Sequence, residues 1–274
     1  MSTTTPLPPL PPLKKISRAL LVGINYKKLP YQLNGCIYDA TNMQAYLTKY
    51  HGCKSIELLT DDTRVKPFKF NILFSLRTML KAAKKGETVL FHYSGHGGLV
   101  PDKDGDESKL PKGIGMDSTL VPLDSMISGM ITDDEMRKVF AQNTPAGVTV
   151  ICVVDSCHSA TSLDLRYCFD TTYPVQKQYD EATHYPATAG QVICISGCVD
   201  AGYSQEVYVD NGRTAGAMTW LLIEMLKSSK NSRRNMTWRE LLTSMRGIMA
   251  ANYIDQSPQI SSGQVMSLSD NVCF

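Results

Sequence analysis

Short apolar runs alternate with segments of helical spacing along most of the 274 residues of this chain. The most strand-like run is VTVICVV at residues 148–154. The other expected strands are Ala19–Tyr26, Ser55–Thr60, Thr88–Tyr93 and Gln191–Ser196. Continuous apolar runs of this length indicate strands that are buried on both faces, as in a parallel sheet covered by helices. We therefore expect an α/β fold, a three-layer sandwich with a mostly parallel central sheet and helices on both faces.

Helices are expected between these strands. Three segments with apolar residues at helical spacing are 34–50, 67–83 and 214–228. Two capping boxes, Thr132 with Glu135 and Thr237 with Glu240, mark the starts of two further helices. The polar, Gly-rich segment 97–115 is expected to be a loop, because it shows neither the apolar spacing of a helix nor the apolar run of a strand.

One domain is expected to account for nearly the whole chain. Residues 1–17 read as a flexible tail, because the prolines interleaved with leucines favour polyproline II and cannot build a core. A ligand for an SH3 or WW domain is the alternative to a plain solvated tail. A single domain would then span residues 18–274.

Composition excludes several classes of function. Lys plus Arg is 28 and Asp plus Glu is 26, so no basic excess points to nucleic acid as the partner. No apolar run approaches the roughly 18 to 20 residues of a membrane helix, and the start of the chain lacks a signal-peptide core. The eight cysteines form no CxxC pair and no disulfide framework. We therefore expect a cytoplasmic protein in a reducing compartment.

A histidine and a cysteine directly follow two of the expected strands. His96 lies between glycines after the strand at 88–93, and Cys157 follows the strand at 148–154. Neighbouring parallel strands would place these ends side by side. A thiol nucleophile needs a base within reach and donors for the oxyanion, and an imidazolium neighbour lowers the pKa of a thiol. Either residue alone reads as structural, but both at equivalent strand ends favour catalysis.

Two other histidines are rival bases. His92 lies within the strand pattern and is expected to be packed in the core. His158 follows Cys157 directly, which gives it an awkward geometry for acting on that thiol.

HYSGHG at 92–97 and DSCHS at 155–159 resemble the catalytic motifs of the caspase-like peptidases of clan CD, and specifically of type I metacaspases. The resemblance covers roughly residues 16–268. Other matching segments, in family order, are NGCIYDA (34–40), MDSTLVPLD (116–124), MITDDEM (130–136), ISGCVDA (195–201) and SPQIS (257–261). The resemblance implies a caspase-like sandwich with a large-subunit-like part (18–164), an irregular linker (165–190) and a small-subunit-like part (191–274).

The resemblance also implies roles for individual residues. Cys157 matches the nucleophile and His96 the general base, and the backbone N–H groups of Gly97 and Cys157 match the oxyanion hole. The residues that match the substrate pocket are Cys36, Asp39, Ser94 and Asp155. The residues that match a calcium site are Asp117, Asp133, Asp134 and Asp164.

Taken alone, several of these acids have simpler interpretations. Asp39 reads as a charge on a helix surface, and Asp155 as a turn former after a strand. Asp133 and Asp134 read as first-turn charges that favour a helix dipole, an explanation that does not extend to Asp117 or Asp164.

Together, the matched residues imply a calcium-activated cysteine endopeptidase that cleaves peptides or proteins after Arg or Lys, since paired carboxylates favour basic side chains. The resemblance further implies a monomer and a role in programmed cell death. Self-cleavage is expected in flexible segments; the candidate sites follow Lys14, Lys15, Arg18 and Lys177. The alternatives are a catalytically silent scaffold with the same fold and a clan CD peptide ligase.

Overall fold

The computed structural model describes residues 15–101, 116–157, 163–169, 179–197, 205–209, 212–232 and 235–273. The Pro-rich segment up to residue 14 and the middle of the expected linker, 170–178, therefore lie outside the described residues. The first strand begins at Ile16, so Ile16 and Ser17 belong to the domain and not to the predicted tail.

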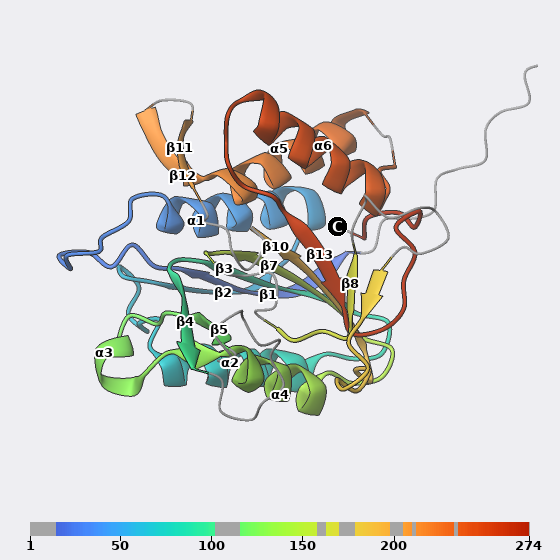
Figure 1. Cartoon of the computed structure of the whole chain (residues 1–274), viewed down its shortest axis with the longest axis horizontal. Helices are drawn as coiled ribbons and strands as arrows, with labels where there is room; N and C mark the ends of the chain where they lie inside the picture. Colours follow the sequence, from blue (N-terminus) through green and yellow to red (C-terminus); the bar gives the residue numbers. More distant parts are fainter. Residues whose placement is uncertain are drawn as a thin grey trace, which may run out of the picture.

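Within the described residues, an eight-stranded sheet has the order β2-β1-β3-β7-β10-β13-β8-β9 (Figure 1). The first five strands in this order, β2, β1, β3, β7 and β10, are parallel to one another. The last three, β13, β8 and β9, each run antiparallel to the strand before them in the order. Their bounds are β1 (Ile16–Gly23), β2 (Ser55–Thr60), β3 (Thr88–Ser94), β7 (Thr149–Asp155), β8 (Tyr167–Phe169), β9 (Tyr179–Glu181), β10 (Gln191–Ser196) and β13 (Gln259–Ser262). The mostly parallel sheet confirms the predicted fold class.

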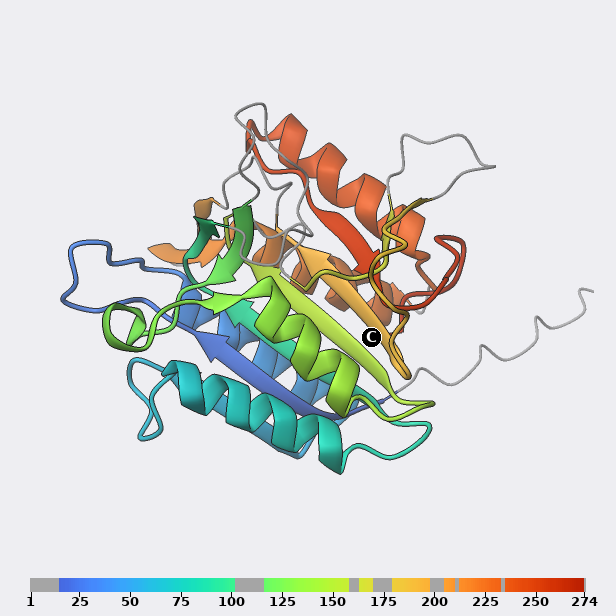
Figure 2. The ribbon, with the colours of Figure 1, turned by 60° about the horizontal axis from the view of Figure 1, so that its bottom comes forward.

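Helices cover both faces of this sheet (Figures 1 and 2). One face carries α1 (Cys36–Tyr46), which continues into a π-helical turn η1 (Leu47–His51), together with α5 (Ala217–Ser232) and α6 (Trp238–Ala251). The other face carries α2 (Lys69–Ala82) and α4 (Asp133–Asn143). Along β7, Ile151 and Val153 pack into the first hydrophobic cluster, whereas Val150 and Val154 pack into the second. Burial on both faces explains the unbroken apolar sequence of this strand.

Two small sheets lie beside the main one. The first consists of β4 (Gly97–Pro101), β5 (Met116–Leu120) and β6 (Ile131–Thr132), with the single-turn helix α3 (Ser125–Ser128) between the last two. The second is the hairpin of β11 (Glu206–Val209) and β12 (Arg213–Gly216).

Three expectations from the sequence need correction. Residues 97–101, expected in a loop, form β4 because they pair with β5. Residues 213–216 form β12, so the helix expected from residue 214 begins at Ala217. The segment 165–190, expected to be irregular, contributes β8 and β9 to the main sheet. Each correction involves a strand that is stabilised by pairing with another segment of the chain. The sequence of the strand itself does not reveal that partner.

Both predicted capping boxes are confirmed, at the starts of α4 and α6. In the described ranges, every helix falls short of the length and apolar character that crossing a membrane requires.

Candidate active site

The carboxyl ends of β3 and β7, two central strands of the sheet, lie side by side. These strands are parallel neighbours, and Ser94 pairs in register with Asp155. The Gly95 N–H donates to the carbonyl oxygen of Asp155 at 3.3 Å, which extends the pairing beyond the strands. Their carboxyl ends point to the left in Figures 1 and 2. The residues that follow, His96 and Cys157, therefore leave the sheet at the same edge.

The backbone of Gly97 lies directly against the backbone of Cys157. A Cβ built on Gly97 would overlap the carbonyl oxygen of Cys157. Ser156 is buried, whereas Cys157 is partly exposed, so the thiol lies at the surface end of the strand. Gly97 also pairs with Leu120 of β5, which holds the segment in place. The His96–Gly97 segment and Cys157, some sixty positions apart in sequence, are thus adjacent in space.

The imidazole of His96 is held in one orientation. Its Nε2 lies 2.7 Å from the carbonyl oxygen of Tyr31. Because a carbonyl oxygen only accepts, Nε2 carries a proton and Nδ1 is the basic nitrogen of the neutral ring. The ring also contacts the ring of Tyr26, with 4.7 Å between centroids. No motif in the sequence indicated Tyr31, because its carbonyl acts through the path of its loop.

Two buried tyrosines support the backbone around His96. The hydroxyl of Tyr26 accepts from the His96 N–H at 2.9 Å and donates to the carbonyl of Val121 at 2.6 Å. The hydroxyl of Tyr93 lies 2.8 Å from the His96 carbonyl. Burial raises the pKa of both phenols, so they remain neutral donors. In the sequence these tyrosines read only as core residues.

His92 does not act as the base. Its side chain is buried, with Nε2 3.4 Å from the hydroxyl of Thr219. Burial lowers the pKa of His92 to about 3, so the ring stays neutral. The expectation that His92 is packed in the core is confirmed, and His158 lies outside the described residues.

Two buried carboxylates, those of Asp39 and Asp155, lie close to one glycine, Gly216. Asp39 of α1 accepts from the Ser94 hydroxyl at 2.6 Å and from the Gly216 N–H at 3.0 Å. A Cβ on Gly216 would lie 2.5 Å from an oxygen of Asp155 and 2.8 Å from an oxygen of Asp39. Both carboxylates therefore pack against Gly216, where no side chain would fit. Cys36, the first residue of α1, is buried three positions before Asp39.

The C-terminal part of the chain fixes the second carboxylate. Asp155 accepts from the Thr219 N–H at 2.9 Å and from Nε2 of Gln256 at 3.3 Å. Oε1 of Gln256 in turn accepts from the Gln205 N–H at 3.4 Å. These residues were missed at the sequence level, because a backbone N–H and an isolated Gln carry no recognisable pattern.

The pocket has a strongly acidic character. Burial raises the pKa of Asp39 well above its usual value, and the charge of Asp155 raises it further, whereas hydrogen bonds from Ser94 and Gly216 lower it. Burial also raises the pKa of the Cys36 thiol, with Asp39 as the second cause. Among the described residues, no Lys or Arg forms an ion pair with Asp39.

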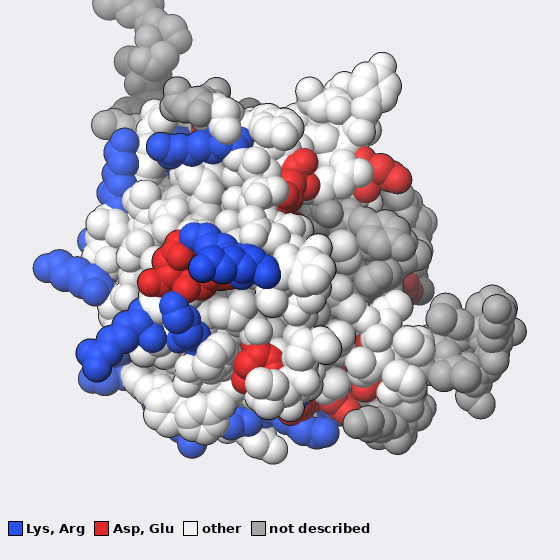
Figure 3. Space-filling view, turned by 90° about the vertical axis from the view of Figure 1, so that its left-hand side faces the viewer, with Lys and Arg blue, Asp and Glu red and all other residues white. Residues whose placement is uncertain are grey.

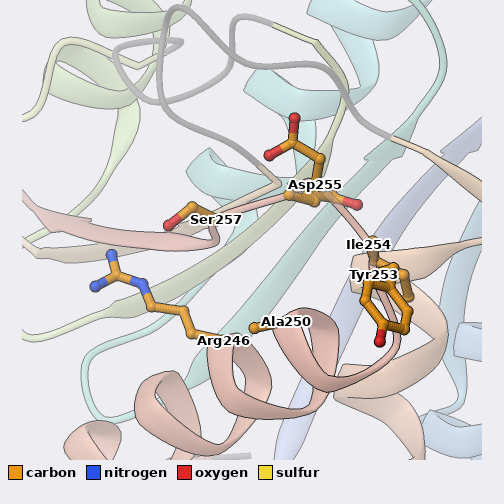
Figure 4. Close-up of a pocket in the computed structure, with 7 residues that line it drawn as sticks. Arg246, Ala250, Tyr253, Ile254, Asp255 and Ser257 are labelled. Atoms are coloured by element: carbon orange, nitrogen blue, oxygen red, sulfur yellow. The ribbon is translucent and has the colours of Figure 1, made fainter.

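An open groove of about 490 Å³ adjoins this pocket through Gln256. Figure 4 shows Arg246 and Ala250 of α6 on one side of the groove, opposite the segment that leads into β13. The other lining residues are Tyr253, Ile254, Asp255, Gln256 and Ser257. The Arg246 side chain is anchored by its Nε, which donates to the carbonyl of Pro258 at 2.9 Å.

The four acids predicted to bind calcium come from β5, the first turn of α4 and the segment before β8. Asp117, Asp133 and Asp164 are buried, and Asp133 accepts from the Ser118 N–H at 2.6 Å, which places it beside Asp117. Asp134 instead pairs with Arg137 at 2.7 Å. Within the described ranges, no three His, Cys, Asp or Glu side chains are arranged to hold a metal ion. The acids therefore form no ready-made ligand set.

Comparisons with known proteins place the His96 and Cys157 segments within a known peptidase family. A family model described as "Metacaspase, peptidase C14 domain" matches residues 17–166, which include both strand ends. Metacaspase-1 of Scheffersomyces stipitis is 34% identical over 89% of this chain and 70% of its own length. The chain belongs to the metacaspases. This family consists of cysteine-type endopeptidases.

Other proteins are similar to this chain in sequence or in fold. Metacaspase-1 of Debaryomyces hansenii is 32% identical over 89% of this chain, but the chain spans only 64% of that relative. The solved structure of protein GSU0716 from Geobacter sulfurreducens is 25% identical, with a TM-score of 0.65, and covers 95% of this chain and 98% of its own. Caspase-1 from Spodoptera frugiperda, at 13% identity and a TM-score of 0.53 over 94% of each chain, shares the fold.

Proposed function

We propose that this metacaspase cleaves peptide bonds after Arg or Lys. The observation that carries the proposal is that the carboxylates of Asp39 and Asp155 both lie against Gly216, and that Asp155 ends the strand that Cys157 follows. Two neighbouring carboxylates suit a guanidinium, which donates from several N–H groups in a planar fork, and also suit an ammonium. All of these groups come from one chain, so the proposed catalytic unit is a monomer.

In the proposed mechanism, Sγ of Cys157 attacks the scissile carbonyl carbon and forms a tetrahedral oxyanion. Backbone N–H groups of Gly97 and Cys157 donate to that oxyanion. Nδ1 of His96 first takes the thiol proton and then gives it to the leaving amine as the C–N bond breaks. Water, deprotonated by the same nitrogen, attacks the thioester, which releases the acid and restores the thiol. The Tyr31 contact supports this role because it leaves Nδ1 unprotonated in the neutral ring.

Calcium activation is part of the proposal. Its support is the burial of three of the four matched acids and the position of Asp117 next to Asp133, since clustered carboxylates are the ligands that calcium prefers. The acids would need to move toward one another to share an ion, because they are not arranged as ligands here.

Self-cleavage is also proposed, at fewer sites than the sequence suggested. Arg18 lies inside β1, where it pairs with Ser55 on one side and Val89 on the other. A bond held in two ladders is a poor substrate, so Arg18 is not in a flexible segment as predicted. Lys15 is exposed and precedes β1, and it remains a candidate. Lys14 and Lys177 lie outside the described residues.

Fluorogenic peptides that differ only in the residue before the cleaved bond test the proposal. We expect turnover of the Arg and Lys peptides but not of the Asp peptide, with loss of activity in Cys157→Ala and His96→Ala. Cys273→Ala, at another partly exposed cysteine, is the matched control and should keep full activity. A calcium titration with a chelator reversal then tests activation. A folded chain without turnover on any basic peptide would favour the scaffold.

A further inference from the structure

The β11–β12 hairpin packs on the start of α1. A Cβ on Gly35 would lie 2.8 Å from the Cα of Ala215 in β12, so only a glycine lets the two backbones approach this closely. The next residue of the hairpin, Gly216, donates to Asp39. The hairpin is therefore part of the wall of the carboxylate pocket.

A third carboxylate, that of Glu206, reaches the same place from β11. Its Oε1 accepts from the N–H groups of Asn34 at 2.8 Å and of Gly35 at 2.6 Å. These two N–H groups precede the first turn of α1 and would otherwise lack a partner in the helix. Gly35 is directly followed by Cys36, so Glu206 lies at the edge of the pocket wall.

The charge of Glu206 affects the pKa of two residues of the proposed pocket. After burial and the nearer acids, Glu206 is a further cause that raises the pKa of Cys36 and of Asp39. Glu206 itself is exposed, and no Lys or Arg among the described residues forms an ion pair with it. An exposed acid without a paired base thus stands next to two buried ones.

The surface around the strand ends has an uneven distribution of charge. Figure 3 looks at the side toward which the carboxyl ends of the parallel strands point. Lys and Arg side chains gather mainly on the left of this view, whereas acidic side chains on its upper right stand without an adjoining base.

We propose that Glu206 is a specificity-determining residue, which attracts and orients the basic side chain of the substrate at the rim of the pocket that Asp39 and Asp155 line. The inference rests on the proposed preference for Arg or Lys and deepens it. An exposed charge acts through solvent over several ångströms, so its effect falls on substrate capture and is screened by salt. A guanidinium has five N–H donors. The two inner acids already accept hydrogen bonds from Ser94, Gly216, Thr219 and Gln256, so a third acid adds acceptors that they do not have to spare.

The competing role for Glu206 is that of a simple anchor for the hairpin. Glu206→Gln separates the two roles, because the amide oxygen still accepts from the two N–H groups while the negative charge is gone. Glu206→Ala removes both the charge and the hydrogen bonds. Glu224→Gln is the matched control, since Glu224 is also exposed at its carboxylate but pairs with Lys227 on α5.

The experiment measures the dissociation constant of an Arg peptide and of its Ala counterpart in the uncleaving Cys157→Ala background. At low ionic strength we expect Glu206→Gln to weaken binding of the Arg peptide about fivefold, the order of one solvent-screened charge interaction. The effect should shrink below about twofold in 0.5 M salt. Binding of the Ala peptide and the Glu224→Gln control should not change. In the active chain, the same substitution should raise KM and leave kcat nearly unchanged.

The outcomes separate this inference from the proposed function. If Glu206→Gln binds the Arg peptide as tightly as its parent while Glu206→Ala does not, Glu206 is an anchor and the inference is wrong. If the parent does not distinguish the Arg peptide from the Ala peptide, the basic pocket is wrong and so is the role of Glu206. Glu206→Gln could weaken binding of the Arg peptide in a salt-sensitive way while the active chain shows no cleavage. That result would support the role of Glu206 in specificity and contradict only the peptidase mechanism.

Discussion

At the residue scale, Gly97 has no room for a side chain, because its backbone touches the carbonyl of Cys157. Gly97→Ala must therefore separate the two segments that carry the proposed base, His96, and the proposed nucleophile, Cys157. Gly98→Ala is the matched control: its Cβ would contact the hydroxyl of Thr119 at 3.1 Å and the sulfur of Met130 at 3.4 Å, and both side chains can shift. We expect Gly97→Ala to lose at least about tenfold in kcat/KM, since misplacement by 1 Å has costs of this order or more, and Gly98→Ala to stay within a few-fold.

Peptide turnover and thermal unfolding, measured together, test this expectation. Both variants should keep a cooperative unfolding transition, so that the loss reflects the site and not the fold. Full activity in Gly97→Ala would mean that the contact with Cys157 has no part in catalysis.

Asp39, a residue of the proposed substrate pocket, also affects stability through its pKa. Burial, followed by the charge of Asp155, raises the pKa of Asp39 in the folded chain. The folded state then binds a proton more tightly than the unfolded state, so stability falls as pH rises from the unfolded pKa of about 3.9 through the raised folded value. Above that window, the folded chain carries the cost of an ionised buried carboxylate until a basic substrate supplies the counter-charge.

Asp39→Asn should therefore be more stable than the parent at pH 8 and lose this advantage toward pH 4. The amide oxygen can still accept from the Gly216 N–H. We expect a Tm higher by a few degrees at pH 8, a shift that corresponds to roughly 1 kcal/mol in a chain of this size. Cleavage after Arg should fall sharply in the same variant. A Tm difference that grows at low pH would contradict the assigned direction of the pKa.

At the scale of elements, the two capping boxes give matched helix starts on opposite faces of the sheet. The hydroxyl of Thr132 accepts from the Glu135 N–H, and that of Thr237 accepts from the Glu240 N–H, each at 3.2 Å. Replacing either Thr by Ala removes the acceptor of one backbone N–H in the first turn of the helix. We expect each variant to lose about 1 kcal/mol of unfolding free energy in urea titrations, with the m-value unchanged.

Thr132 and Thr237 differ in their distance from the matched calcium acids. Thr132 directly precedes Asp133 and Asp134, so Thr132→Ala should also weaken calcium activation, whereas Thr237→Ala serves as its control. Equal calcium dependence in both variants would mean that the first turn of α4 has no part in calcium activation.

Strands of six residues or more were predictable from the sequence, and several strands of three or four residues were not. β2 and β10 have the predicted bounds, and β3 differs by a single residue. These strands carry their own signal, because burial on one or both faces selects apolar residues along them. The strands β8, β9, β11 and β12 have three or four residues each and depend on hydrogen bonds to partners elsewhere. Such strands leave too short a pattern in their own sequence.

The same distinction applies to the site. His96 and Cys157 were found because each directly follows a recognisable strand, and parallel neighbours bring their ends together. Tyr31, Gln256 and Glu206 act through a loop path, an amide or a hairpin, and none belongs to a short motif. Their roles depend on tertiary contacts across 65 to 172 positions, which only the assembled fold reveals.

At the scale of the whole molecule, both halves of the chain build one sheet and one pocket. The family match ends at residue 166, yet both pocket carboxylates accept hydrogen bonds from residues beyond 190. In the sheet, β10 pairs with β7, which precedes the expected linker, and β13 pairs with β8, which lies inside it. The large-subunit-like and small-subunit-like parts therefore interlock within one folding unit.

This interlocking predicts that a cut after Lys177, one of the proposed self-cleavage sites, leaves the molecule assembled. The cut would fall between β8 and β9, which pair through Cys168 with Asp180 and Phe169 with Tyr179. A recognition sequence for an unrelated site-specific protease, inserted after Lys177, allows the cut to be made on demand. We expect the two fragments to co-elute in size exclusion, to separate only in denaturant, and to retain peptide turnover within about twofold, because buried sheet ladders and core contacts hold them together. The same insertion left uncut is the control; fragments that part without denaturant would show that the continuous chain, and not the shared sheet, holds the pocket together.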